Sequence, residues 1–166
     1  MLQICFMKHI QILIAFLLLS VTMQAQLVVQ VYDGDTYKIL QKGKFQIIRL
    51  ANVDAPELNQ YYGKLVKSAV SNLILARIVE IEPIGKDPFK RTIAKVRIDD
   101  MPLDSLIVAK GWGWHFIQYS NWPELSNFEA IAKKAKLGMW RCPKNVPPWI
   151  WRKLNAKQKR FHEMCR

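Results

Sequence analysis

The sequence predicts a small α+β domain, and three observations lead to that fold class. The chain has 166 residues, of which 51% are hydrophobic, which suffices for one packed core with short extensions. Several segments alternate apolar and polar residues with the period of a strand, and others repeat apolar residues every three or four positions, as helices do. Segments of the two kinds are interspersed along the chain, and no internal repeat is visible.

The alternating segments predict five strands. The pattern is clearest at 92–98, where Ala94, Val96 and Ile98 face away from Lys95 and Arg97. The five predicted strands cover residues 27–32, 36–40, 45–50, 77–82 and 92–98. Helical spacing predicts helices at 64–76, 103–110 and 124–137, the last ended by Gly138 in the position of a C-cap. Loops are predicted at 52–60 and 83–91, and an irregular tail begins at 143–148.

Residues 1–25 predict a cleaved secretory signal peptide. The single charge of this segment, Lys8, precedes an apolar run over residues 10–21, and the segment ends at the small residue Ala25. A membrane span needs about 20 apolar residues, so this run is short for one. An uncleaved anchor that holds the protein at the membrane and a buried N-terminal helix are the alternatives, and Met7 is an alternative start. We therefore expect a secreted or periplasmic protein with a folded domain at 26–140.

Basic residues are concentrated at the C-terminus. The formal net charge is +12, and residues 141–166 hold eight basic residues against one acidic residue, Glu163. This balance predicts a polyanionic partner, either nucleic acid or an anionic surface, and argues against a collagen-like or low-complexity protein. We expect the basic tail, 141–166, to dock on the domain.

Export would change the role of the cysteines. Cys5 would leave with the signal peptide, and Cys142 and Cys165 would remain as an even number in an oxidising compartment. We expect a disulfide between these two, with two unpaired thiols as the alternative. No Cys pair or Cys/His cluster has the spacing of a zinc site, and the three histidines are far apart in the sequence.

A small set of charged residues at strand ends and in loops could carry chemistry, since functional groups are usually displayed there. The set is Asp33, Asp35, Arg49, Asp54, Glu57, Asp87 and Arg91. Two carboxylates can hold a hard cation, arginine matches the geometry of a phosphate, and a third carboxylate can take a proton from an attacking water. Together they would suit metal-assisted phosphodiester hydrolysis. Singly, each residue also fits a turn or a solvated salt bridge.

The order of these residues resembles the staphylococcal nuclease (thermonuclease) family. Three motifs carry the resemblance, namely Asp33-Gly34-Asp35-Thr36, then Arg49-Leu50-Ala51-Asn52-Val53-Asp54-Ala55-Pro56-Glu57, then Asp87-Pro88-Phe89-Lys90-Arg91. Gly63, the segment 111–115 and the Trp-rich segment 138–152 also fit, so that the similarity covers about residues 27–153. Three ordered motifs at compatible spacing are far more specific than any one of them.

The resemblance implies an OB-fold, a five-stranded Greek-key barrel with about three helices around it. It also implies a Ca²⁺-dependent nuclease that cuts DNA and RNA, leaves 3′-phosphate ends and acts as a monomer without a protein partner. Position by position, it assigns Asp35 and Asp54 to the metal, together with the backbone carbonyl of Ala55, and Asp33 to a supporting role. Glu57 would orient or deprotonate the attacking water, and Arg49 and Arg91 would clamp the phosphate.

Other positions that match the family are expected to contact the substrate, and some of them depart from its pattern. Phe89 keeps the ring of the usual tyrosine without its hydroxyl, and Lys90 stands where the family has a glycine. Ile117 replaces a nucleotide-stacking tyrosine, whereas Tyr119 is retained. We expect Phe89, Lys90 and Tyr119 to bind substrate.

Two alternatives to a secreted nuclease stay open. One is a catalytically weak, nuclease-like module that only binds nucleic acid. The other is a protein whose basic tail binds anionic lipid or cell wall. Trp149 and Trp151 beside Arg152 could stack on bases, although docking of the tail through ordinary apolar contacts is the stronger expectation.

Overall fold

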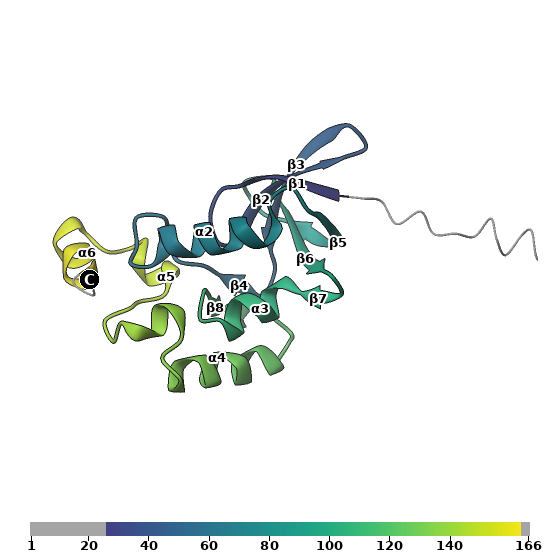
Figure 1. The fold of residues 1–166 in the computed structure, drawn as a ribbon. Helices are drawn as coiled ribbons and strands as arrows, with labels where there is room; N and C mark the ends of the chain where they lie inside the picture. Colours follow the sequence, from purple (N-terminus) through teal and green to yellow (C-terminus); the bar gives the residue numbers. More distant parts are fainter. Residues whose placement is uncertain (1–25, 164–166) are drawn as a thin grey trace, which may run out of the picture.

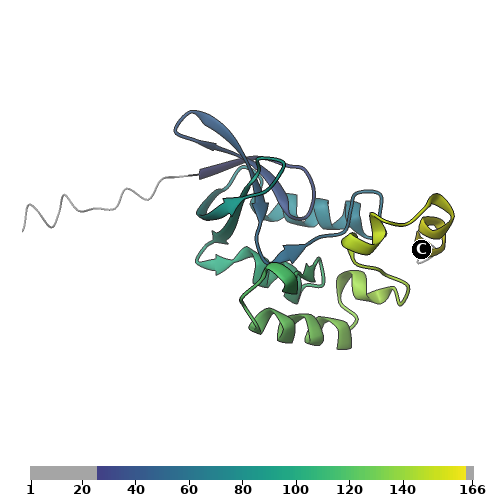
Figure 2. The same ribbon diagram turned by 180° about the vertical axis from the view of Figure 1, so that it is seen from behind.

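The computed structural model describes residues 26–163, without the side chain of Glu163. The predicted signal peptide, 1–25, and Cys165 therefore lie outside the described residues. Figures 1 and 2 show a barrel at one end of the molecule, the C-terminal helices at the other, and a long helix between them.

Five strands close into a barrel. They are β1 (Gln26–Val31), β2 (Thr36–Gln41), β3 (Lys44–Leu50), β5 (Ile78–Lys86) and β6 (Thr92–Ile98). Neighbouring strands follow the order β3-β2-β1-β5-β6, and a parallel pairing of β3 with β6 closes the ring. A two-residue strand, β7 (Met101–Pro102), extends the sheet beyond β6. This closed barrel confirms the α+β class and the OB-fold that the resemblance implies.

The barrel core follows from the alternation of the strands. In β6, Ala94, Val96 and Ile98 are buried, whereas Lys95 and Arg97 point to solvent, as the sequence predicts. Such alternation places every second side chain inside the barrel and leaves the others outside.

Of three helices outside the barrel, the first two pack against it and the third packs on the second (Figure 1). They are α2 (Gly63–Ile74), α3 (Leu103–Ala109) and α4 (Glu124–Lys134). Helix α2 buries Val66, Val70 and Ile74, which are spaced four apart and form one apolar stripe. Two short strands, β4 (Val53–Asp54) and β8 (Trp114–His115), pair with each other, and η1 (Ile117–Tyr119) follows β8. Within residues 26–163, no helix has the length and the apolar character that crossing a membrane requires.

Two predicted boundaries are wrong for identifiable reasons. Strand β5 continues to Lys86 instead of ending at 82, because a bulge between Pro83 and Gly85 lets the pairing with β6 pass the proline. Helix α4 ends at Lys134, and Lys136 takes the left-handed conformation, with φ of 52°, that a C-cap glycine usually supplies. Gly138 instead begins the 3₁₀ helix η2 (Gly138–Arg141).

The tail is more ordered than the sequence predicts. It forms two helices, α5 (Pro148–Trp151) and α6 (Ala156–Glu163). Asn155 and Gln158 begin α6 with a reciprocal capping box, in which each side-chain oxygen accepts the backbone N–H of the other residue. The run from Ala156 to Arg160 consists of good helix formers.

Contacts with the loop after β4 hold the tail in place. Trp151 is only 1% exposed, and its indole N–H donates to Asn59 Oδ1 at 3.1 Å. The Gln60 side-chain amide donates to the carbonyl of Val146. Cys142 is buried and disulfide-bonded, while its predicted partner Cys165 lies outside the described residues. Burial of Trp151 agrees with a structural role in docking rather than with stacking on bases.

Gly63 is essential where the loop after β4 meets α2. A Cβ added there would lie 1.9 Å from the carbonyl oxygen of Glu57, which is backbone and cannot rotate away. We predict that Gly63→Ala destabilises the fold by about 1–3 kcal/mol, because the loop must move to relieve the overlap. Urea unfolding measures the change.

Gly85→Ala is the control, since an added Cβ there meets nothing within 4 Å. Equal unfolding midpoints for Gly63→Ala and the unmodified protein would contradict the tight packing that the structure shows.

Candidate active site

A pocket of about 850 Å³ opens at one end of the barrel, where several loops converge. Most of the predicted site residues line it, namely Asp33, Asp35, Arg49, Ala55, Glu57, Phe89, Arg91 and Tyr119. Asp54 lies beneath this lining, with its carboxylate bonded to two side chains that do reach the pocket, Arg49 and Arg152. Lys90 does not line the pocket.

The turn after β1 presents Asp35 to the pocket. Asp33 Oδ1 accepts the backbone N–H groups of Asp35 at 3.0 Å and Thr36 at 2.8 Å, which fixes the turn. Gly34 lets this turn pack closely on its neighbours, because a Cβ there would lie 2.6 Å from side-chain atoms of both Ala55 and Val66. Asp33 therefore shapes the turn that carries Asp35.

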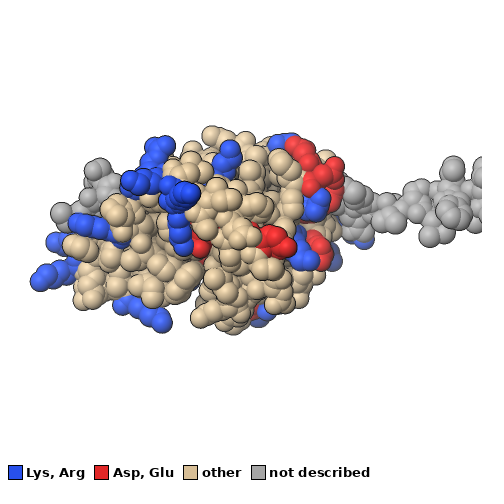
Figure 3. Space-filling model, turned by 90° about the horizontal axis from the view of Figure 1, so that it is seen from below, with Lys and Arg blue, Asp and Glu red and all other residues tan. Residues whose placement is uncertain are grey.

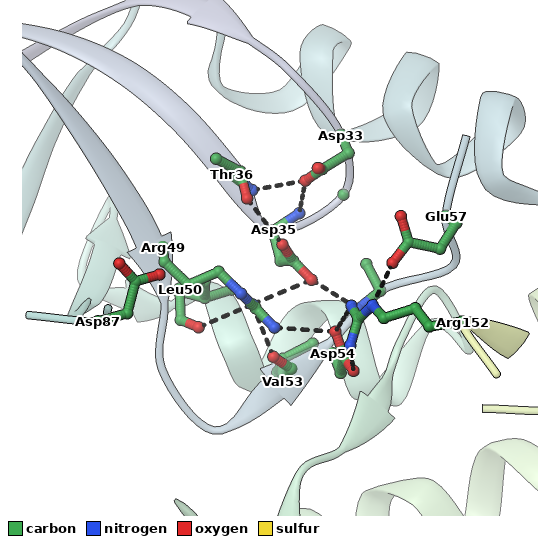
Figure 4. Close-up of polar contacts among 12 residues, drawn as sticks. Asp33, Asp35, Thr36, Arg49, Leu50, Val53, Asp54, Glu57, Asp87 and Arg152 are labelled. Atoms are coloured by element: carbon green, nitrogen blue, oxygen red, sulfur yellow. Dashed lines mark hydrogen bonds and ion pairs between the residues drawn. The ribbon is translucent and has the colours of Figure 1, made fainter. Parts of the chain in front are cut away.

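Arg49 joins the two carboxylates that the family resemblance assigns to a metal (Figure 4). Its Nη1 lies 3.0 Å from Asp35 Oδ2, and its Nη2 lies 2.9 Å from Asp54 Oδ1. Nη1 also donates to the carbonyls of Leu50 and Val53, at 3.1 and 2.9 Å. The backbone N–H of Ala55 donates to Asp35 Oδ2 at 2.7 Å. These contacts bring Asp35, from the turn before β2, and Asp54, from β4, to one guanidinium.

The electrostatics of the site reflect crowded carboxylates. Burial, reinforced by the negative charge of Asp35, raises the pKa of Asp33 to about 7. Burial and the same charge also raise the pKa of Asp54, although the nearby Arg49 opposes the shift. Removal of a carboxylate from water disfavours its ionised form, and a neighbouring negative charge adds to the effect. Additional positive charge at this place would therefore be stabilised.

The donors of the site are oxygens, which suit a hard cation such as Ca²⁺ or Mg²⁺. Among residues 26–163, no group of three or more His, Cys, Asp or Glu side chains is arranged to hold a metal. Asp35 and Asp54 would thus supply two carboxylate ligands to such a cation. Backbone, water and phosphate oxygens would complete its coordination. Mg²⁺ that acts on phosphates is often held in this way, by one or two carboxylates together with phosphate oxygens and waters.

Glu57 and Asp54 share a second arginine, which comes from the tail (Figure 4). Arg152 Nε lies 2.6 Å from Glu57 Oε1, and Nη1 and Nη2 lie 3.2 and 3.1 Å from the two oxygens of Asp54. The Arg152 side chain is 51% exposed, whereas Asp54 is fully buried. Arg152 is not among the site residues predicted from the sequence. Its only signal was its position beside two tryptophans that match the end of the family pattern.

Arg91 is held by the loop between β5 and β6. Asp87 Oδ1 accepts the backbone N–H groups of Phe89 and Arg91, both at 2.9 Å, and its Oδ2 lies 2.6 Å from Arg91 Nε. Burial acts against the charged form of Asp87, but the hydrogen bonds from Arg91 prevail and lower its pKa. Arg91 Nη1 also donates to Thr36 Oγ1 at 3.3 Å, which directs the guanidinium toward the start of β2, next to Asp35.

Lys90 is strained where the family has a glycine. Its φ is 65°, in the left-handed region that glycine occupies without steric cost. Lys90 thus takes this conformation at the cost of a strained backbone.

Aromatic rings border the pocket. Tyr119 is 73% exposed and Phe89 is 80% exposed. Phe116, which the sequence analysis does not single out, lines the pocket and stacks on Trp149, with ring centroids 5.4 Å apart and planes inclined by 16°. The ring of Tyr119 lies 4.8 Å from that of Phe116. Exposed rings next to arginines can stack on nucleotide bases.

Comparison with known proteins matches residues 47–142 to the staphylococcal nuclease homologue family. An uncharacterized endonuclease of Escherichia coli O157:H7 is 35% identical over 126 residues, which are 75% of this chain and 82% of the relative. An uncharacterized endonuclease of Haemophilus influenzae is 34% identical over 127 residues, 76% of this chain and 71% of the relative. A probable staphylococcal-like nuclease of Oryza sativa subsp. japonica is 33% identical over 115 residues, 69% of this chain and 23% of its own length. The matched residues span the larger part of the barrel, and with the three ordered motifs gathered in one pocket they lead to one conclusion: the chain belongs to the staphylococcal nuclease family.

Proposed function

We propose that this protein is a secreted, calcium-dependent nuclease that hydrolyses phosphodiester bonds of DNA and RNA and leaves 3′-phosphate ends. Family membership and the endonuclease relatives make it a nuclease, a hydrolase of phosphodiester bonds. The observation that carries the proposal is that Arg49 holds Asp35 and Asp54 together in a pocket that Glu57 and Arg91 also line.

The residues divide the reaction among them. Asp35 and Asp54, with the backbone carbonyl of Ala55, would hold Ca²⁺, which when bound supplies positive charge to the phosphate oxygens. Arg49 and Arg91 would bind the phosphate and stabilise the negative charge that builds up on it. Glu57 would accept a proton from the attacking water. The water oxygen bonds to phosphorus, the bond from phosphorus to the 5′ oxygen breaks, and that oxygen takes up a proton, for which Arg91 is a candidate donor.

The surroundings of the pocket suit a nucleic acid without a fixed sequence. Tyr119 and Phe89 offer exposed rings for stacking on bases, which discriminates little between them. Figure 3 shows Lys and Arg side chains gathered on the side of the molecule that carries the C-terminal helices. Such charge attracts the phosphate backbone irrespective of sequence. We expect the protein to act as a monomer.

A module that only binds nucleic acid is the alternative function. The presence of all the charged side chains that the proposed chemistry needs, in one pocket, favours the nuclease. Cleavage of DNA or RNA by the purified protein separates the two functions.

Cleavage should require Ca²⁺. We predict that the mature protein cuts single-stranded DNA, duplex DNA and RNA with Ca²⁺ and that cleavage stops with excess chelator. Phosphodiester hydrolysis here would need the positive charge of the cation that Asp35 and Asp54 would hold. Asp54→Asn should raise the Ca²⁺ concentration needed for half-maximal activity while the fold persists. Asp99→Asn is the matched control, since Asp99 pairs with Arg77 on the surface, away from the pocket. Full cleavage in excess chelator would rule out the metal.

Glu57 should be required for turnover. We predict that Glu57→Gln lowers kcat by about two to four orders of magnitude, the range typical for a positioned acid–base group. KM should change little, because glutamine preserves the shape of the side chain. Steady-state cleavage of a defined oligonucleotide measures both, with Glu124→Gln on the exposed start of α4 as the control. A kcat within a few-fold of the unmodified enzyme would mean that Glu57 is structural.

Export and disulfide formation can be tested together by intact-mass measurement. We predict a mature protein that starts near Gln26 and contains a bond between Cys142 and Cys165, because Cys142 is disulfide-bonded and removal of Cys5 leaves one candidate partner. An unstrained bridge over this loop should stabilise the tail by about 3 kcal/mol. Mass spectra of the secreted protein are recorded after alkylation, with and without prior reduction. Two alkylated thiols before reduction would contradict the bridge.

A further inference from the structure

A basic side chain from the tail, Arg152, binds two carboxylates of the pocket. All three nitrogens of the Arg152 guanidinium contact carboxylate oxygens, two on Asp54 and one on Glu57. Arg152 lies 95 residues beyond Glu57 in the sequence. It also lies outside residues 47–142, which match the family model. The contact therefore joins a segment beyond the matched domain to the proposed base.

The tail holds the whole loop that carries Glu57, in addition to its side chain. Gln60 accepts the backbone N–H of Glu57 through Oε1 at 3.2 Å, and its amide nitrogen donates to Val146 in the tail. Asn59 accepts the indole N–H of the buried Trp151, the residue before Arg152. Three side chains of this loop, those of Glu57, Asn59 and Gln60, are thus bonded to the tail. Among these contacts, the one made by Arg152 holds the Glu57 carboxylate.

We propose that Arg152 is a positioning residue for the nuclease reaction, which fixes the Glu57 carboxylate at a set place beside Asp54. The inference rests on the proposed function, in which Glu57 takes a proton from water. The Glu57 side chain is one-third exposed, so without this contact it would be free to change rotamer. A displacement of about 1 Å in a reacting group can cost about 100-fold in rate.

The geometry favours positioning over direct binding of substrate phosphate. The two terminal nitrogens of Arg152 contact both oxygens of Asp54 in a fork, and Nε contacts Glu57. A fork of this kind fixes orientation as well as charge, which a lysine cannot reproduce. These contacts engage all three nitrogens of Arg152 with carboxylates of the protein itself.

Lys153 provides a matched control. It is adjacent to Arg152, carries the same charge and is exposed, and its backbone N–H bonds within the turn of α5. Arg152→Gln and Lys153→Gln remove the same charge from the same segment. An effect of general attraction for nucleic acid would be equal in both variants and would raise KM.

We expect Arg152→Gln to lower kcat by about 10- to 100-fold with KM within a few-fold of the unmodified enzyme, and Lys153→Gln to leave kcat unchanged. Arg152→Lys should recover only part of the loss, because it restores the charge without the fork. Melting temperatures of all three variants verify that the fold is kept. Equal kinetic parameters for Arg152→Gln and Lys153→Gln would overturn the assignment.

A double variant tests whether Arg152 acts through Glu57. If it does, Arg152→Gln should cause no further loss of kcat in a Glu57→Gln background, since residues that act as a unit are not additive. Full additivity of the two losses would overturn the inference.

A crystal structure of Arg152→Gln gives a readout that needs no activity. We expect the Glu57 carboxylate to be displaced or to occupy several rotamers. Glu57 ordered at its original position would overturn the inference. Failure of the unmodified protein to cut DNA or RNA would contradict the proposed function alone, and the crystal structure would still decide whether Arg152 positions Glu57.

Discussion

The guanidinium of Arg49, whose side chain is 12% exposed, is the group on which the site depends, because it contacts Asp35 and Asp54 at once and also donates to two backbone carbonyls. Two carboxylates taken out of water without a cation would lose much of the free energy of hydration. Removing one partner of a buried ion pair usually lowers the free energy of unfolding by about 3–5 kcal/mol, since the other charge is left uncompensated. Arg49 therefore makes it possible to bury the carboxylates at the base of a pocket.

The barrel places Arg49 where it can do this. In the sheet, Arg49 lies between Thr36 of β2 and Ile93 of β6, its partners in the antiparallel and parallel pairings. Closure of the barrel thus brings the turn before β2 and the loop before β6 to the two sides of the same strand. Those segments carry Asp35 and Arg91. A rigid barrel with functional side chains on its loops is a common way to hold a site.

The tail adds a second layer of constraint to the same cluster. Arg152 compensates the charge of Asp54 from the solvent side, whereas Arg49 does so from inside the barrel. Trp151 and Cys142, both buried, anchor the segment that carries Arg152. The carboxylates of the pocket consequently lie between two arginines that come from opposite ends of the fold. The site is therefore built by the domain and its tail together.

Much of this protein is determined by local sequence. Alternation predicts the strands because each strand buries one face, as β6 shows. The three charged motifs predict most residues of the pocket because each motif is one short continuous segment of the chain. The Asp87 turn forms with Lys90 in the left-handed conformation. Strand β5 passes Pro83 by a bulge that pairing with β6 determines, which its own residues do not reveal.

Tertiary structure decided the contacts between distant segments. The parallel pairing of β3 with β6, the stacking of Phe116 on Trp149 and the bond from Asn52 to the buried Asp104 join residues that have no local pattern in common. Arg152 is the clearest case. In the sequence it is one of several basic residues of the tail, and it carries the same positive charge as its neighbour Lys153. Only packing of Trp151 against the loop after β4 aims its guanidinium at Asp54 and Glu57, because the direction of a side chain depends on where its backbone is anchored.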